Sequence, residues 1–406
     1  MKHCDSFTLY NIHMLKGIFK RAGTHFGGSI ISRIFATSTF ILLSRYIPLN
    51  EYGQGILGIT VIQLGNVAGD FGLTQWYQKQ EHEEKAFFIL LPLRLILGFV
   101  VSIAIVAMNV YLSWFTTDLA LLIAGINLLQ SFTSIASAYL ILHKRVIMPS
   151  LLQAMLSIPI LLLIFLAPRD VTLFNTYAAF ALGNTFAIFI LFPLNRLRFS
   201  LQPPSALWSA LRASSKYALL TYTSATYARA DSILVRVYAG EAALGFYGLA
   251  YRYLEYFAML PSSVVQILFP IFAQKEGTRK HLFDMTVVMG AIGAAVAGVV
   301  MTSASVVILT LHGTTYAASI PILKVLSGSL ILFFVNAPLA TFVQASDIVK
   351  KFLPFGIANT VLNVVLNVTF IPQFGLLAAA YVMLTTEITG LLINVYFVRK
   401  VFGHRV

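Results

Sequence analysis

Long apolar runs alternate with short polar segments along almost the whole chain. A run of about 19 residues is enough for a helix to cross a hydrocarbon core of about 30 Å. The first run is longer than the apolar core of a secretory signal, so we expect it to be retained as a span. The pattern predicts twelve membrane-spanning helices. They cover residues 17–46, 53–73, 86–110, 115–142, 149–167, 172–193, 213–238, 245–273, 284–311, 317–345, 352–371 and 375–398.

The seventh predicted span contains an unusually polar stretch, TYTSATYARADSILVRVYAG (221–240). At about 100° per residue, Tyr222, Arg229 and Arg236 fall on one side of the helix, whereas Asp231 points the other way. A charge at mid-bilayer costs about 3 kcal/mol on insertion scales, so such residues usually face a bundle interior or an aqueous cavity. The stretch therefore predicts a polar stripe directed toward the inside of a helix bundle.

The composition places the chain among polytopic membrane proteins. Hydrophobic residues make up 58% of the 406 residues and charged residues 11%, whereas a soluble domain has roughly 25% charged residues. The net charge of +13 is spread in short clusters between apolar runs, so we expect no nucleic-acid binding. Cys4 is the single cysteine, which excludes an intramolecular disulfide and a thiolate cluster for metal. We expect neither a metal nor a cofactor.

The distribution of basic residues predicts the orientation. With a cytoplasmic N-terminus, 20 of the 28 Lys and Arg residues fall in cytoplasmic segments and only Arg169 falls in the opposite loops. By the positive-inside rule this bias places both termini in the cytoplasm. The other basic residues lie within predicted spans: Arg33, Arg45, Arg94, Arg229, Arg236, Arg252 and Lys324.

The chain repeats itself at an offset of about 200 residues. Residues 141–168 parallel residues 344–372, with basic pairs and prolines in matching positions, and residues 42–53 resemble residues 233–248. Each half has an even number of predicted spans, so the halves are related by a parallel pseudo-two-fold axis along the membrane normal. Substrate sites form between halves in such an arrangement, which predicts a central cleft.

The repeat predicts two six-helix lobes, 1–195 and 213–406, joined by a cytoplasmic linker, 196–212. Pro203 and Pro204 interrupt any helix that enters this linker. The residues that follow them predict a short helix on the cytoplasmic surface.

Three motifs carry a resemblance to a known family: SRYIPLNEYGQGILGI (44–59), GDFGL (69–73) and VLNVVLNVTFIPQFGLLAAAYVMLTTE (361–387). They resemble the polysaccharide-repeat, or O-antigen, flippases of the multidrug/oligosaccharidyl-lipid/polysaccharide exporter superfamily. Ala378 departs from the pattern, because members often carry Gly there. The resemblance implies an all-α transporter with twelve transmembrane helices in two lobes. Its central cleft would be lined by the first two helices of each lobe and open alternately to the two sides of the membrane.

The polar residues of these four helices are the candidate substrate-binding residues. Guanidinium groups suit a lipid-linked pyrophosphate because they stay charged and bind phosphate oxygens bidentately. Internal ion pairs, Arg229 with Glu255 and Arg252 with Asp231, are the alternative interpretation of the same charges. The candidates are Arg33, Gln63, Asn66, Tyr222, Arg229, Arg236 and Arg252.

Four carboxylates within spans are candidates for ion coupling, because membrane carboxylates often relay protons. They are Asp70, Asp231, Glu255 and Glu387. A structural pairing is the alternative for each of them.

The sequence thus predicts a flippase, with no enzymatic activity, in the bacterial inner membrane. Its partners would be the lipid bilayer, an undecaprenyl-pyrophosphate-linked oligosaccharide and proteins of polysaccharide assembly. A cation or drug antiporter of the same superfamily is the nearest alternative, although it would favour an acidic cleft. A membrane glycosyltransferase or polysaccharide polymerase is a second alternative, but the short loops leave no room for a sugar-nucleotide domain. The chain has no P-loop motif for ATP hydrolysis.

Overall fold

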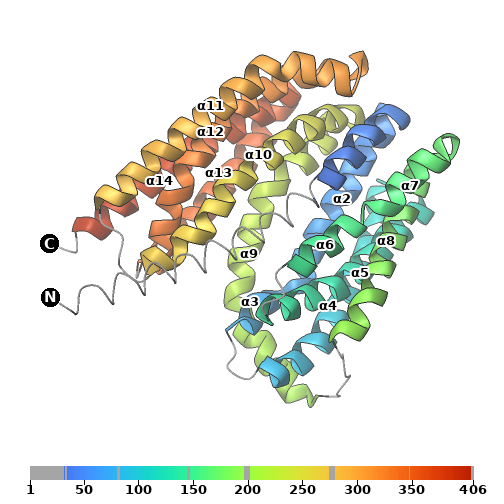
Figure 1. The fold of residues 1–406 in the computed structure, drawn as a ribbon, viewed down its shortest axis with the longest axis horizontal. Helices are drawn as coiled ribbons and strands as arrows, with labels where there is room; N and C mark the ends of the chain where they lie inside the picture. Colours follow the sequence, from blue (N-terminus) through green and yellow to red (C-terminus); the bar gives the residue numbers. More distant parts are fainter. Residues whose placement is uncertain are drawn as a thin grey trace, which may run out of the picture.

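The protein is described by a computed structural model in which two groups of long helices lie side by side (Figure 1). The structure describes residues 32, 34–79, 83–143, 147–195, 202–273, 279–346 and 348–403. Residues 34–46 are helical. The helices that follow are α2 (Leu49–Asp70), α3 (Leu73–Tyr77), α4 (Glu83–Leu112), α5 (Thr117–Leu142), α6 (Ile147–Met155), α7 (Ile158–Leu166), η1 (Pro168–Asp170), α8 (Leu173–Asn195), α9 (Pro204–Ala239), α10 (Glu241–Ala273), α11 (Arg279–Leu311), η2 (Thr314–Tyr316), α12 (Ser319–Gln344), α13 (Val349–Phe374) and α14 (Leu376–Gly403).

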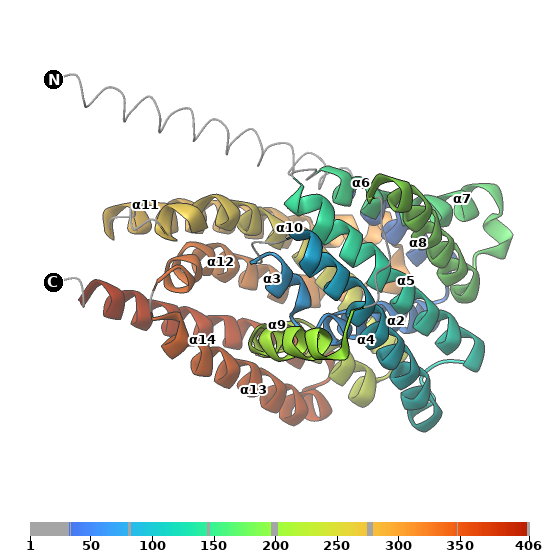
Figure 2. The same ribbon diagram turned by 90° about the horizontal axis from the view of Figure 1, so that it is seen from below.

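Helices from the first half of the chain form one lobe and those from the second half form the other. Helices α2, α4, α5 and α8 pack together in the first lobe, and α9 to α14 pack together in the second. Both views show this separation, with the blue and green helices apart from the orange and red ones (Figures 1 and 2). The lobes meet where α2 packs against α9 and α10. The predicted all-α fold in two lobes is confirmed: in the described part of the chain, each predicted span from the second onward corresponds to a long helix, with α6 and α7 together forming one span.

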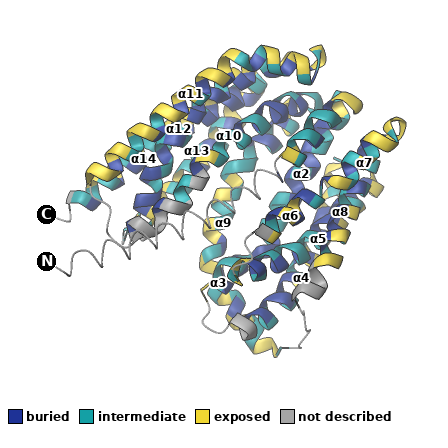
Figure 3. Cartoon of the chain, viewed as in Figure 1, coloured by how far each residue is buried: buried dark blue, intermediate teal, exposed yellow. Residues whose placement is uncertain are grey.

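Within the described residues, eight helical segments are long and apolar enough to cross a membrane by composition alone. Helices α2, α9 and α10 are not among these eight. Some of their charged residues, among them Arg229, Arg252 and Glu255, lie at the junction of the lobes. By contrast, the outer surface of α11 is lined with exposed apolar side chains such as Phe283, Val288 and Val299 (Figure 3). Such a surface suits contact with lipid tails.

Two spans differ from the prediction in their details. The fifth is divided at Leu156 and Ser157 into α6 and α7, because Pro159 begins a new helix and removes a backbone donor. The seventh begins at Pro204 and runs without interruption to Ala239. A proline at the first helical position is compatible with the helix. The short surface helix predicted after the prolines is therefore the first part of α9.

The GDFGL motif forms the turn between α2 and α3. Phe71 (φ 46°) and Gly72 (φ 73°) both adopt the left-handed conformation, which ends α2. A Cβ on Gly72 would lie 2.6 Å from the carbonyl oxygen of Ser214 on α9. Glycine is thus required twice over at this position, for its dihedral angle and for the close approach of α9.

The start of α9 packs against the first lobe. Leu207 and Leu211 contact an apolar cluster formed mainly by α3 and α4, and Ala210 is buried within it. Residues 204–212 therefore attach α9 to the lobe that precedes it in sequence.

Candidate functional site

A cavity of about 670 Å³ lies where the two lobes meet. The first lobe contributes the helical segment that ends at residue 46, together with α2, α5, α6, α7 and α8. The second lobe contributes α9 and α10. The cavity therefore has walls from both halves of the chain, as expected for a site between pseudo-symmetric lobes.

The wall from the second lobe is charged. Arg229 Nη2 on α9 lies 2.5 Å from Glu255 Oε1, and Arg252 Nη1 lies 3.0 Å from Glu255 Oε2. The Arg229 guanidinium also lies 5.8 Å from the centroid of the Tyr251 ring. Two cations and one anion line the described part of the cavity, so this wall has a surplus of positive charge.

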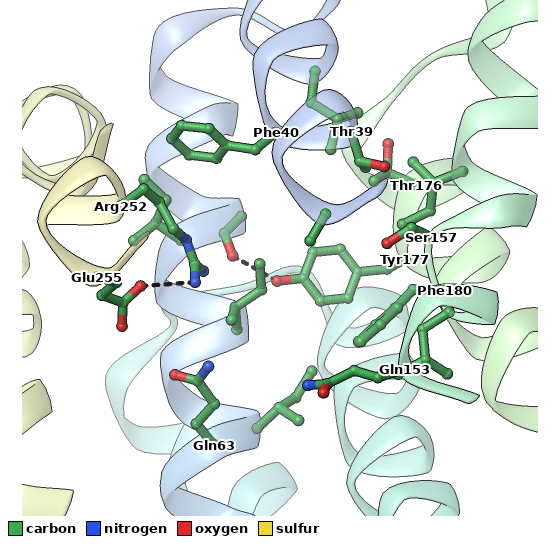
Figure 4. Close-up of a pocket in the computed structure, with 18 of the residues that line it drawn as sticks. Thr39, Phe40, Gln63, Gln153, Ser157, Thr176, Tyr177, Phe180, Arg252 and Glu255 are labelled. Carbon is green, nitrogen blue, oxygen red and sulfur yellow. Dashed lines mark hydrogen bonds and ion pairs between the residues drawn. The ribbon is translucent and has the colours of Figure 1, made fainter. Parts of the chain in front are cut away.

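The wall from the first lobe is uncharged among the described residues, with amide and hydroxyl side chains set between apolar ones such as Phe40 and Phe180 (Figure 4). The Tyr177 hydroxyl donates to the carbonyl oxygen of Gly55 at 2.6 Å, which fixes its ring at the cavity wall. Gly58 leaves space for this ring, since a Cβ there would lie 2.2 Å from the hydroxyl oxygen. Amide and hydroxyl side chains also line this part of the cavity: Thr39, Gln63, Gln130, Gln153, Ser157 and Thr176.

Three of the predicted substrate-binding residues line this cavity: Gln63, Arg229 and Arg252. Arg33 lies outside the described residues. The other three do not line it and have protein partners of their own. Asn66 donates to Gln130 Oε1 at 2.5 Å, and the Tyr222 hydroxyl donates to the Ala68 carbonyl at 3.0 Å. Arg236 pairs with Glu241 at 2.7 Å.

The prediction of an Arg229–Glu255 pair is confirmed, but the prediction of an Arg252–Asp231 pair is wrong. Arg252 and Glu255 are three residues apart on α10, so they share one face of the helix. Asp231 lies on the side of α9 away from the cavity, where the Tyr247 hydroxyl and the Ser232 backbone N–H donate to it.

The other two candidate coupling carboxylates lie in separate polar clusters. Asp70 Oδ1 is 3.9 Å from Arg94 Nε in the first lobe and accepts a hydrogen bond from Thr74. Glu387 lies in the second lobe, where it accepts from the Tyr227 hydroxyl at 2.6 Å and from Asn336 Nδ2 at 3.2 Å. Of the four candidates, Glu255 is the one that lines the cavity.

Several polar residues that shape the site were not identified from the sequence. Arg94 is 2% exposed and donates to Asn66 Oδ1 at 3.1 Å. Its position in the apolar run FFILLPLRLILGF was the available signal for an interior partner. Gln130, Gln153 and Tyr177 gave no such signal, because single amides and tyrosines are common in membrane helices.

Among the described residues, no group of three or more His, Cys, Asp or Glu side chains could hold a metal ion.

Comparisons with known proteins agree with this architecture. The model of the polysaccharide biosynthesis protein family matches residues 42–321, more than half of the chain. The chain belongs to this family. The match includes two of the three motifs that carried the predicted resemblance and the polar stripe of α9. Comparison with curated protein sequences gives no significant match.

Solved transporters share the fold. The lipid II flippase MurJ in an inward closed conformation has a TM-score of 0.69 and 14% identity, covering 93% of this chain and 87% of that chain. An inward-facing multidrug resistance MATE family transporter of the MOP superfamily has a TM-score of 0.74 and 13% identity, covering 94% and 98%. A third structure is a MOP superfamily transporter from Pyrococcus furiosus, whose binding pocket is reported to have reverse polarity. It has a TM-score of 0.65 and 14% identity, covering 97% of both chains. This protein is thus a multi-pass membrane protein with the fold of the MOP superfamily.

Proposed function

We propose that this protein is a flippase for polyprenyl-pyrophosphate-linked oligosaccharides, such as an O-antigen unit or a related polysaccharide repeat. The observation that carries the proposal is the cavity between the lobes, with two arginines on one wall and uncharged amide and hydroxyl groups among apolar side chains on the other. The lipid carrier would be undecaprenyl pyrophosphate. Membership of the polysaccharide biosynthesis protein family supports this class of substrate.

The two walls suit the two polar parts of such a molecule. Arg229 and Arg252 present guanidinium groups, which bind phosphate oxygens with charge-assisted hydrogen bonds. Gln63, Gln130 and Gln153 present amides, which can donate to and accept from sugar hydroxyls. The volume of about 670 Å³ is typical of sites that enclose a drug-sized ligand. It therefore suits the pyrophosphate and the first sugars, while the polyprenyl chain stays in lipid.

We further propose transport by alternating access across the bacterial inner membrane, from the cytoplasmic to the periplasmic leaflet, with both termini in the cytoplasm. The asymmetry of Lys and Arg residues supports this orientation. Lobes 1–195 and 213–406 would move relative to each other around the cavity, with 196–212 as the connection. The packing of Leu207 and Leu211 near α3 would keep the connection attached to the first lobe during this movement.

A translocation assay in proteoliposomes tests the proposal. Wild-type protein is expected to move a pyrophosphate-linked oligosaccharide between leaflets, and Arg229→Gln and Arg252→Gln are expected to slow this at least tenfold. Arg212→Gln is the matched control, because it removes the same charge from an exposed position on α9. Normal translocation by both cavity variants would contradict the proposal.

The antiporter alternative predicts a different outcome in the same system. An exporter of organic cations would move a cationic dye against a proton or sodium gradient. The surplus of Arg over carboxylate in the described lining favours an anionic substrate instead. Dye transport that is unaffected by the lipid-linked oligosaccharide would favour the antiporter.

A further inference from the structure

Glu255 lies between the two arginines that line the cavity. We propose that Glu255 is an internal counter-anion, which the substrate's pyrophosphate displaces from Arg229 and Arg252 in each transport cycle. This inference rests on the proposed function, because that function supplies the anion. On this inference, the arginines pair with Glu255 when the site is empty and with the pyrophosphate when substrate is bound.

The geometry supports an exchange of anions. Each Glu255 oxygen accepts from one arginine: Oε1 from Arg229 at 2.5 Å and Oε2 from Arg252 at 3.0 Å. A phosphate group also offers several oxygens that can accept from two guanidinium groups at once. The carboxylate therefore occupies one N–H donor of each guanidinium, and a phosphate would compete for the same two groups.

The position of Glu255 makes displacement possible. The side chains of Arg229, Arg252 and Glu255 are 16%, 20% and 23% exposed, and all three line the cavity. An anion in the cavity can thus reach the arginines while the helices stay packed. Two arginines without a counter-anion would be unfavourable in a membrane interior, so Glu255 stabilises the empty site. The exchange leaves both arginines in contact with an anion in each state.

A second ion pair between the same two helices provides a comparison. Arg236 on α9 and Glu241 on α10 lie 2.7 Å apart, with side-chain exposures of 20% and 24%. Gln54 also donates to Glu241 at 3.0 Å. This pair matches Arg229–Glu255 in chemistry and exposure, but neither of its members lines the cavity. Removing the negative charge of Glu241 should therefore leave anion binding unchanged.

The role assigned to Glu255 predicts that its removal tightens binding. In Glu255→Gln the phosphate no longer competes with a carboxylate, so affinity for a diphosphate should rise by about tenfold or more, the scale of one charge-assisted hydrogen bond. Release should slow, so translocation should fall although binding improves. A purely structural Glu255 would produce the opposite effect on binding, since its loss would disorder both arginines.

Equilibrium binding of farnesyl pyrophosphate to the full-length protein in nanodiscs tests this, with farnesol as the uncharged comparator. The expected order of affinity is Glu255→Gln above Glu255→Asp above wild type, with Glu241→Gln equal to wild type. Glu255→Asp is included because its shorter carboxylate cannot reach both arginines at once. If Glu255→Gln does not fold, Glu255→Asp decides the question.

The possible outcomes separate this inference from the proposed function. Farnesyl pyrophosphate binding by wild type, with equal or weaker binding by the Glu255 variants, would overturn the counter-anion role and leave the anion site intact. An absence of binding above the farnesol level in wild type and in all variants would overturn both.

Discussion

Gly53 on α2 lies directly against the backbone of Glu241, the first residue of α10. A Cβ at Gly53 would be 2.0 Å from the Glu241 carbonyl oxygen, so only glycine allows the two helices to approach this closely. Gly245 makes a similar approach to Leu49 from the opposite helix. This contact joins the two lobes at the end of the cavity that is close to the Arg236–Glu241 pair.

We predict that Gly53→Ala separates the lobes at this contact. Because the neighbour is backbone and cannot turn aside, the substitution should cost about 1–3 kcal/mol of packing. The expected result is a lower Tm in detergent and faster labelling of a cysteine placed at Ile56 beside the contact. Gly298→Ala on α11 is the control, since nothing lies within 4 Å of its Cβ position. Unchanged Tm and labelling in Gly53→Ala would show that the approach is looser than the structure indicates.

We expect Arg94, the buried arginine of the first lobe, to contribute to the stability of the folded protein. Arg94 Nε lies 3.9 Å from Asp70 Oδ1, and Arg94 Nη2 donates to Asn66. We predict that Arg94→Met destabilises the protein by about 3–5 kcal/mol, because it leaves Asp70 without its cation in the protein interior. Thermal unfolding in detergent measures this.

The double variant Arg94→Met/Asp70→Asn should recover part of the loss, since neither charge then remains unpaired. Lys324→Met is the control, because it removes one positive charge from an exposed position. A wild-type Tm for Arg94→Met, combined with lost translocation, would assign Arg94 a transport role instead.

Glu387 has an environment that suits a carboxylate able to bind and release a proton. It is 6% exposed, and its hydrogen-bond partners Tyr227 and Asn336 are neutral. We predict that Glu387→Gln preserves folding but abolishes the response of translocation to an imposed pH gradient, because the amide cannot carry a proton. Asp118→Asn, at an exposed position in the first turn of α5, should respond like wild type. A full gradient response in Glu387→Gln would exclude coupling at this site.

The buried environment of His312 predicts that the folded protein loses stability at acidic pH. It lies in the turn after α11, where its ring nitrogens are 2.5 Å from Ser44 Oγ and 2.8 Å from the Tyr253 hydroxyl. Burial, and then the charge of Arg45, lower the pKa of His312 from 6.5 to about 4. The unfolded chain binds this proton at higher pH than the folded protein does, so stability should fall as pH decreases from about 6.5 to about 4.

Measurement of Tm between pH 7 and pH 4 tests this prediction. His312→Gln should be less stable at pH 7, because it loses contacts, but its Tm should depend less on pH across this window. The same substitution at His143, which is exposed, should leave the pH dependence of wild type unchanged. Parallel curves for wild type and His312→Gln would count against the prediction.

Hydropathy and helical periodicity were sufficient to predict the spans and the faces on which charges lie. The apolar runs predicted the twelve-span, two-lobe fold, and the stripe of α9 predicted that Arg229 would face inward and Asp231 away from it. These features are local, because they depend on the length of a run and on about 100° of rotation per residue. The short helix after Pro204 was predicted to be separate, because the sequence shows the prolines but not the packing that holds this segment in line with α9.

The partners of the charges required the tertiary structure. Arg252 pairs with Glu255 rather than with Asp231. Arg94 pairs with Asp70 and donates to Asn66, both on the neighbouring helix α2. The relative height and rotation of packed helices decide such pairings, and these depend on close contacts such as Gly53 against Glu241. The sequence by itself determined which helices cross the membrane and which of their faces are polar. Only the tertiary structure decided that two arginines and one glutamate meet at a single cavity, because that requires α9 and α10 to be set against α2.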